Sequence, residues 1–319
     1  MAKSSLRAKF FYHYLLYTEA KHHQKLDISR QFLSVSPHQA LSEKAHIRLE
    51  TKGGHPIWRL EPKEPVKLYE VVSTRKTNLL YLYNSRLHQG IRKQHWEFLA
   101  ALLDSEITSI MVPEIPLNHD KPIEQSVTWI REYLCPEVLN DCSSTNDWVI
   151  ISEGSSALFS FYLLNELAIH RQVPVRELIL ISPWLDCSFS NPLIENLVEK
   201  DPIHNREGYQ AWLSEFIQAE STGLDDSFFT PIYQKLTLLP PISLYSAGRD
   251  ILQADASKLK VRAVSEPIVF KYYEYSEMFN EWYHYPIPER DYFLTHVKAH
   301  WNLPMSEWER SNELDSSFW

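Results

Sequence analysis

Glycine is scarce in this sequence, with only 7 among 319 residues. That number is low for an α/β enzyme, because glycine lets a backbone approach a ligand closely or adopt a positive φ. Cysteine is scarcer still. The 3 cysteines, Cys135, Cys142 and Cys187, are odd in number and lack metal-ligand spacing. We therefore expect reduced thiols, with neither a disulfide framework nor a zinc site.

Basic residues are also in deficit, since 32 Lys and Arg stand against 41 Asp and Glu, a net charge of −9. A nucleic-acid surface needs clustered Lys and Arg, so no nucleic-acid partner is expected. No uncharged run is long enough to span a bilayer. The N-terminal run "FFYHYLLY" is short, contains His13 and lacks a small-residue cleavage site, so it is not predicted to be a signal peptide. We expect a cytoplasmic protein without a membrane span, and no cofactor or metal is indicated.

The composition is that of a globular protein, with 44% hydrophobic and 23% charged residues. The first forty-odd residues are predicted to be helical, because Leu6, Phe10, Tyr14 and Leu15 recur at helical spacing. Three strand-like runs follow around a turn at Gly53-Gly54, namely "HIRLET", "PIWRLEP" and "VKLYEVVS".

Apolar strands then alternate with amphipathic helices. The predicted strands are "NLLYLY", "ITSIMVPEI", "DWVIIS", "RELILISPW", "PPISLYSAG" and "EPIVFKYYEY", and the predicted helices are "HWEFLAALL", "IEQSVTWIREYL" and "SALFSFYLLNELAI". This alternation predicts an α/β fold, a mostly parallel sheet covered by helices on both faces. Chemistry in such sheets lies at the carboxyl ends of the strands. The loops of interest therefore follow Tyr83, Ser152, Ala247 and Tyr275.

The stretch "VIISEGSSALF" (149–159) predicts a strand, a sharp turn and a helix. That order is the nucleophile elbow of hydrolases, whose pattern is G-x-S-x-G. The turn is tight, so the residues two before and two after its tip must be small. With Gly154 at the tip, those neighbours are Ser152 and Ser156. With Ser155 at the tip, the preceding neighbour would be Glu153, which is too large, so the tip is predicted to be Gly154.

Four segments carry a resemblance to a known family. They are "YLYNSRLHQGIRKQHW" (81–96, with Gly90, His95 and Trp96), "ILISPWLDCSFSNP" (179–192), "LLPPISLYSAGRDIL" (238–252) and "YSEMFNEWYHYPIPE" (275–289). In this order they resemble the hormone-sensitive-lipase-like group of α/β-hydrolase esterases, over about residues 70–290. The resemblance implies a central sheet of about eight strands with a helical cap. It also implies one domain over 1–319, with cap elements at about 1–45 and 190–220 and core at about 46–190 and 220–319.

Most of the family's catalytic residues are replaced at the matching positions. The resemblance places the nucleophile at Gly154, the acid at Asp250 and the base at Asn280. Only the acid is retained, and an amide such as Asn280 does not titrate in the range that a general base needs. A carboxylate alone does not activate a nucleophile, because its role is to orient a histidine.

The oxyanion loop differs as well. The family has HGG where this sequence has Tyr83, Asn84 and Ser85, followed by Arg86. Glycines serve there because backbone N–H groups must approach the developing oxyanion with no side chain between. We therefore expect the side chains of this loop to crowd the oxyanion hole.

Two functions compete on this evidence. One is a non-catalytic α/β-hydrolase-like protein that binds a small molecule or a protein partner through the old pocket and cap. The other is a divergent carboxylesterase that uses Ser155 as a displaced nucleophile, with His88 or His284 as the base. Glu153 is either a pocket carboxylate or an ion-pair partner. Pairing of two copies through the last strand is implied by the resemblance alone.

Overall fold

The computed structural model describes residues 4–18, 34–37, 39–63, 76–84, 90–103, 107–116, 122–140, 146–170, 174–216 and 226–302. Its strands are β1 Ala45–Lys52, β2 His55–Pro62, β3 Lys76–Leu82, β4 Ile107–Pro113, β5 Asn146–Glu153, β6 Val175–Ile181, β7 Ile242–Ala247 and β8 Phe270–Tyr275. Its helices are α1 Leu6–Tyr17, α3 Gln39–Lys44, α4 Lys93–Leu102, α5 Pro122–Trp129, α6 Cys135–Asn140, α7 Ala157–Ile169, α8 Arg206–Phe216, α9 Asp226–Phe229, α10 Gln253–Ala263 and α11 Pro288–Asn302.

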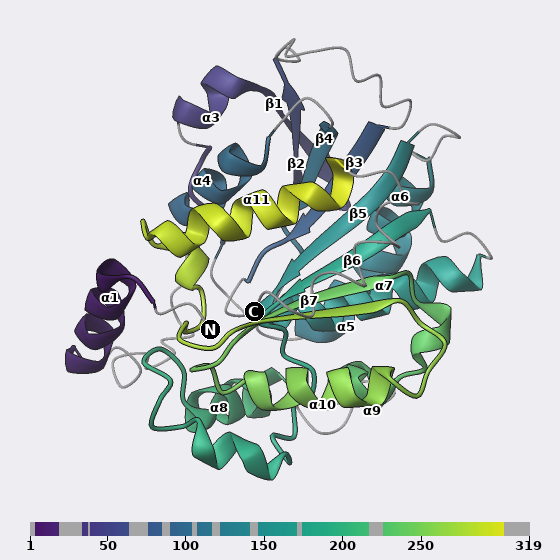
Figure 1. Ribbon diagram of the computed structural model, residues 1–319. Helices are drawn as coiled ribbons and strands as arrows, with labels where there is room; N and C mark the ends of the chain where they lie inside the picture. Colours follow the sequence, from purple (N-terminus) through teal and green to yellow (C-terminus); the bar gives the residue numbers. More distant parts are fainter. Residues whose placement is uncertain are drawn as a thin grey trace.

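The strands form one eight-stranded sheet in the order β1-β2-β4-β3-β5-β6-β7-β8 (Figure 1). β2 is antiparallel to both β1 and β4, and every other neighbouring pair is parallel. The central strands are rich in Val, Ile and Leu, as expected for parallel strands buried on both faces. The predicted α/β fold with a mostly parallel sheet is confirmed. The predicted strand "VKLYEVVS" (66–73) lies outside the described residues.

Helices cover both faces of the sheet (Figure 1). α5, α6, α7 and α10 share one apolar cluster with strand residues such as Leu80 and Ile150. α4 and α11 share a second cluster with Leu79 and Ile151, the chain neighbours of that pair. Successive strand side chains point to opposite faces, so each strand contributes to both clusters.

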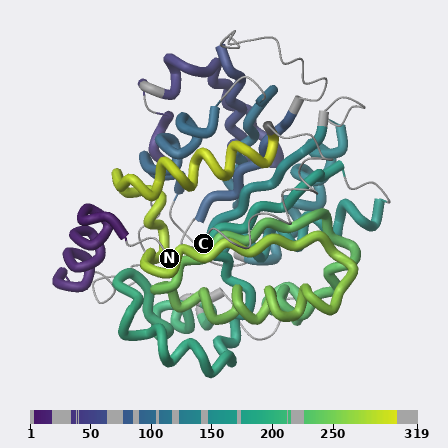
Figure 2. The backbone as a smooth tube through the Cα atoms, viewed as in Figure 1, coloured from purple at the N-terminus to yellow at the C-terminus, as the bar shows by residue number. Residues whose placement is uncertain are grey.

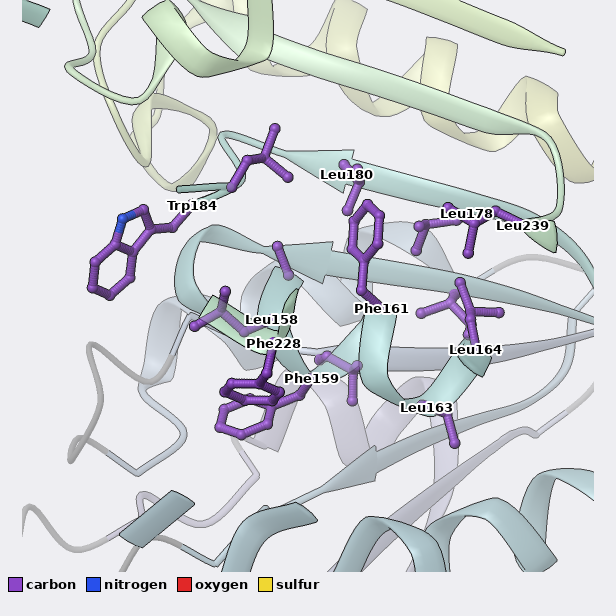
Figure 3. Packing of buried hydrophobic residues seen from close by; sticks show 14 of the residues in the cluster. Leu158, Phe159, Phe161, Leu163, Leu164, Leu178, Leu180, Trp184, Phe228 and Leu239 are labelled. Carbon is purple, nitrogen blue, oxygen red and sulfur yellow. The ribbon is translucent and has the colours of Figure 1, made fainter. Parts of the chain in front are cut away.

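α7 lies in the first cluster and is apolar nearly all round. Figure 3 shows its side chains, Phe161 and Leu164 among them, packed with Leu178 and Leu180 of β6. The Phe159 ring lies 5.9 Å from the ring of Phe228 in α9. Packing on all sides explains why this helix, which directly follows the predicted elbow, is rigidly held.

The N-terminal helix is confirmed over α1, and most of the residues whose spacing predicted it do not face the core. Leu6, Phe10 and Tyr14 point to solvent, whereas Ala8, Tyr12 and Leu15 are buried. The Tyr12 hydroxyl donates to the carbonyl oxygen of Lys200 at 3.1 Å. Docking therefore uses the opposite side of the helix from most of the residues that revealed its periodicity.

α1 packs at the edge of the molecule where β7 and β8 end (Figures 1 and 2). The Arg249 guanidinium, just after β7, lies 4.0 Å from the centre of the Tyr12 ring. The Tyr12 and Phe279 rings are 6.3 Å apart. α1 and the segment around Lys200 thus cover the carboxyl edge of the sheet. Within the described ranges, no helix combines the length and apolar character needed to cross a bilayer.

Candidate functional site

Gly154 lies at the turn between β5 and α7, at the start of a one-turn 3₁₀ segment over Gly154–Ser156, with φ at +53°. This left-handed conformation favours glycine. The hydroxyl oxygens of Ser152 and Ser156 lie 2.9 Å apart, and Ser156 also donates to the Leu82 carbonyl oxygen at 2.6 Å. Larger side chains two residues either side of Gly154 would not fit there.

The side chain of Asn84 fills the space beside Gly154. A Cβ placed on Gly154 would lie 2.6 Å from Asn84 Cγ, 2.7 Å from its Nδ2 and 2.8 Å from its Oδ1. Such distances are far shorter than van der Waals contact, and Asn84 is itself buried. A nucleophile at this position would need that Cβ. A side chain at residue 154 and the Asn84 amide in its present position therefore cannot occupy this space together.

The amide oxygen of Asn84 also faces the backbone beyond the tip. The Ser155 N–H points to Asn84 Oδ1 at 3.5 Å, and the Ser155 hydroxyl donates to the same oxygen at 3.1 Å. In nucleophile elbows, the N–H after the nucleophile is a donor of the oxyanion hole. Here that N–H faces a carbonyl oxygen supplied by the protein's own chain.

Glu281 and Arg92 fix the other end of the Asn84 amide. Asn84 Nδ2 donates to Glu281 Oε1 at 3.2 Å, and Arg92 Nη2 donates to the same oxygen at 2.8 Å. Burial lowers the pKa of Arg92, but the attraction of Glu281 more than offsets it, so the pKa is raised. Because the carboxylate only accepts, the amide nitrogen must face Glu281 and the amide oxygen must face Ser155.

Asp250 and Asn280, where the resemblance places the acid and the base, are hydrogen-bonded to each other. Asn280 Nδ2 donates to Asp250 Oδ2 at 2.7 Å, and the Leu252 N–H donates to Asp250 Oδ1 at 2.9 Å. Both side chains are buried. Asp250 thus accepts from an amide at the position where the resemblance places an imidazole, and the Asn280 amide itself neither takes up nor releases a proton at neutral pH.

Asp250 also has an acidic neighbour, Asp201. Burial and then the negative charge of Asp201 raise the pKa of Asp250 to about 7. Asp201 Oδ2 accepts from the Ile251 N–H at 3.0 Å, and Asp201 Oδ1 accepts from the N–H groups of Ile203 and His204 at 2.8 Å. Asp201 therefore ties its own segment to the loop that carries Asp250.

Ser155 and His284, the proposed displaced nucleophile and base, face different partners. Ser155 donates to an amide oxygen, whereas His284 Nε2 lies 3.5 Å from Glu153 Oε2. His284 does not follow Asn280 on a continuing helix. Glu281 adopts φ +57°, and a 3₁₀ turn over Trp282–His284 follows. His284 is buried, and Glu153 is its close neighbour as well as the acceptor of the Tyr81 hydroxyl at 2.8 Å. Ser85, Arg86 and His88 lie outside the described residues.

Two clusters bring potential metal-ligand atoms within 4.8 Å of one another, His95 with Glu153 and His284, and Asp201 with His204 and Asp250. The first fits a metal poorly. His95 Nδ1 accepts the Arg92 backbone N–H at 3.0 Å, so the proton of a neutral ring sits on Nε2, which lies 3.3 Å from the Arg92 guanidinium. In the second cluster the carboxylates already accept backbone and amide N–H groups, as described above.

Comparison with known proteins supports the fold. A sequence model of the family described as "alpha/beta hydrolase fold" matches residues 156–284. The chain has an α/β-hydrolase fold. The structure is similar to an esterase/lipase from an uncultured bacterium (TM-score 0.75, 14% identity, covering 94% of this chain and 98% of that one). It is also similar to a hormone-sensitive lipase from a metagenome library (TM-score 0.73, 14% identity, covering 94% and 99%). No curated protein matches the sequence. The predicted resemblance to α/β hydrolases of the hormone-sensitive-lipase type is thus confirmed.

Sequence reasoning missed the residues that support the α/β-hydrolase site from a distance. Arg92, Asp201 and Glu281 were not singled out, although they hold Asn84 and Asp250. Asn84 and Glu281 are 197 residues apart in sequence. No local motif marks such a pair, and the one available signal was the position of Glu281 directly after Asn280.

Proposed function

We propose that this protein is a non-catalytic member of the α/β-hydrolase fold whose role is to bind a small molecule or a protein partner. The observation that carries the proposal is the Asn84 amide, which lies where the Cβ of a residue 154 nucleophile would be. Acyl transfer by serine hydrolases needs a hydroxyl at this tip, an oxyanion hole and a histidine. Gly154 provides no hydroxyl, and Asn280 provides no imidazole.

Weak residual catalysis is not expected either. Serine proteases that lose a triad member keep roughly 10³–10⁴-fold acceleration from the oxyanion hole and substrate binding. In this protein the Ser155 N–H faces Asn84 Oδ1. A substrate carbonyl would have to displace an amide that Glu281 also holds, so the residual mechanism loses its main donor.

The alternative, a divergent carboxylesterase that uses Ser155, has less support. Ser155 is buried, and its hydroxyl donates to an amide oxygen, which does not accept a proton at neutral pH. A serine nucleophile needs an adjacent base that removes its proton. The polar atom that faces His284 Nε2 is Glu153 Oε2, at 3.5 Å.

Hydrolysis of p-nitrophenyl acetate tests the catalytic part of the proposal. The wild type and the Gly154→Ser/Asn280→His variant should both be inactive, because Asn84 still fills the site in each. Adding Asn84→Gly frees the space and should give the first measurable turnover. Wild-type turnover that is lost in Ser155→Ala but kept in Ser160→Ala, a buried serine of α7, would overturn the proposal.

Native mass spectrometry and cross-linking of protein purified from its own cells test the binding part. We expect either a stoichiometric excess mass on the chain or one dominant cross-linked partner. A bare chain with no specific partner in both measurements would contradict the binding role.

A further inference from the structure

Helix α1 carries a second apolar face that stays exposed among the described residues. Leu6, Phe10, Tyr14 and Tyr17 are 84%, 64%, 54% and 88% exposed. Their spacing of four, four and three residues places them along one side of the helix. The Phe10 and Tyr14 rings stack on each other with centroids 6.2 Å apart. This set of four residues is called the α1 stripe below.

The opposite side of α1 already anchors the helix. Ala8, Tyr12 and Leu15 are buried, and the Ser5 side chain caps the helix by accepting from the Ala8 N–H. The Ser5 backbone N–H and hydroxyl donate to Glu289 at 2.5 and 2.9 Å. The helix is therefore held in place without the stripe. It lies at the periphery of the molecule, where a flat surface can reach it (purple in Figures 1 and 2).

The exposed charged residues of α1 itself are positive, although Glu289 contacts Ser5 at the start of the helix and the whole chain carries a net charge of −9. Arg7 and Lys9 are exposed on the same helix, Lys3 precedes them in the sequence, and no acidic residue occurs before Glu19. Tyr and Phe with nearby Lys and Arg are typical of helices that lie in the interface between a bilayer and water.

We propose that α1 docks the protein on the surface of a bilayer rich in anionic phospholipids, with the α1 stripe in the interface and Arg7 and Lys9 at the lipid headgroups. A second copy of the chain fits this face less well, because pairing of two stripes would bring the cations of both copies together. The helix has 12 residues, so it is about 18 Å long. One short helix with few cations predicts weak, reversible attachment.

Co-sedimentation with vesicles tests the proposal on the full chain. We expect binding to vesicles of phosphatidylcholine with phosphatidylglycerol, and at least tenfold weaker binding to phosphatidylcholine alone. Arg7→Glu/Lys9→Glu should weaken binding to anionic vesicles by roughly tenfold or more, since each basic residue near such a surface contributes a substantial factor. The matched control Lys235→Glu/Lys260→Glu changes two exposed lysines elsewhere and should bind like the wild type.

A second pair of variants tests the stripe itself. Phe10→Ser/Tyr17→Ser should abolish sedimentation, while Tyr292→Ser/Val264→Ser, which removes two apolar side chains that are 69% and 87% exposed elsewhere, should not. Serine resembles Phe and Tyr in helix propensity, so α1 should stay folded, and an unchanged thermal midpoint checks this. Equal binding by both variants, or self-association through α1 without vesicle binding, would overturn the proposal.

Discussion

The side-chain amide of Asn84 lies so close to Gly154 that any Cβ at residue 154 would overlap with it, at 2.6 Å from Asn84 Cγ. The two residues are therefore interdependent. Gly154 permits the Asn84 side chain to lie beside the turn, and any larger residue at 154 would force that side chain to move. Glu281 stabilises this arrangement by accepting from the Asn84 amide nitrogen.

Gly154→Ala should therefore destabilise the protein by two separable effects. The φ of +53° costs alanine roughly 1–2 kcal/mol, and the overlap with Asn84 adds to that. In an Asn84→Ala background the overlap is relieved, so the same substitution should cost about 1 kcal/mol less. Urea unfolding of the four proteins in this double-mutant cycle measures the coupling.

Gly54 is the matched control for that cycle. It has φ +84° but no atom within 4 Å of a Cβ placed there. Gly54→Ala should show backbone strain alone, and its cost should be the same with and without Asn84→Ala. Additive effects at Gly154 as well would show that the overlap with Asn84 is not real.

At residue 281, replacement by glycine should destabilise the protein less than replacement by alanine, although alanine is usually the milder substitution. Its φ is +57°, so Glu281→Gly relieves backbone strain that Glu281→Ala keeps. We expect Glu281→Ala to cost about 2–3 kcal/mol, because the Arg92 charge loses a largely buried partner, and Glu281→Gly to cost roughly 1 kcal/mol less. Denaturant midpoints check the order. Glu277→Ala is the control, because it removes an acidic partner of Arg249 that is more exposed than Glu281. It should change stability by less than about 1 kcal/mol. An equally small effect of Glu281→Ala would contradict the prediction.

Stability should fall as the pH rises from about 4 to about 7. The pKa of Asp250 is raised from 3.8 to about 7 in the folded protein. Between pH 3.8 and about pH 7 the folded chain keeps a proton on Asp250 that the unfolded chain has lost. The stabilisation from this proton is therefore complete below pH 3.8 and has been lost by about pH 7. The slope is at most about 1.4 kcal/mol per pH unit for this group. Asp255, whose pKa is raised to about 6 mainly by burial, acts in the same direction.

Asp201→Asn separates these two contributions. It removes the charge that faces Asp250 and should bring the pKa of Asp250 closer to its usual value, whereas Asp255 is unchanged. Unfolding free energies across the range from about pH 5 to about pH 8 should then decline less steeply above pH 6 than in the wild type. An identical pH profile for both proteins would show that Asp201 and Asp250 do not interact.

The sheet and the elbow were predictable because their signals are local. Alternating apolar runs mark the parallel strands, and the small residues Ser152 and Ser156 mark Gly154 as the tip. The arrangement of Asn84 was not predictable, because its amide is oriented by Glu281 from the far end of the chain. The docked face of α1 was not predictable, since periodicity shows that a helix has apolar sides but not which side meets the core.

The most direct measurement is reaction of the wild-type protein with a fluorophosphonate probe, followed by intact-mass and peptide mass spectrometry beside an active serine hydrolase as positive control. Because the elbow tip is Gly154 and Ser155 donates to Asn84, we predict no adduct on the chain while the control is fully labelled. One adduct per chain located on Ser155, and lost in Ser155→Ala, would contradict the central claim that this fold has no functional nucleophile.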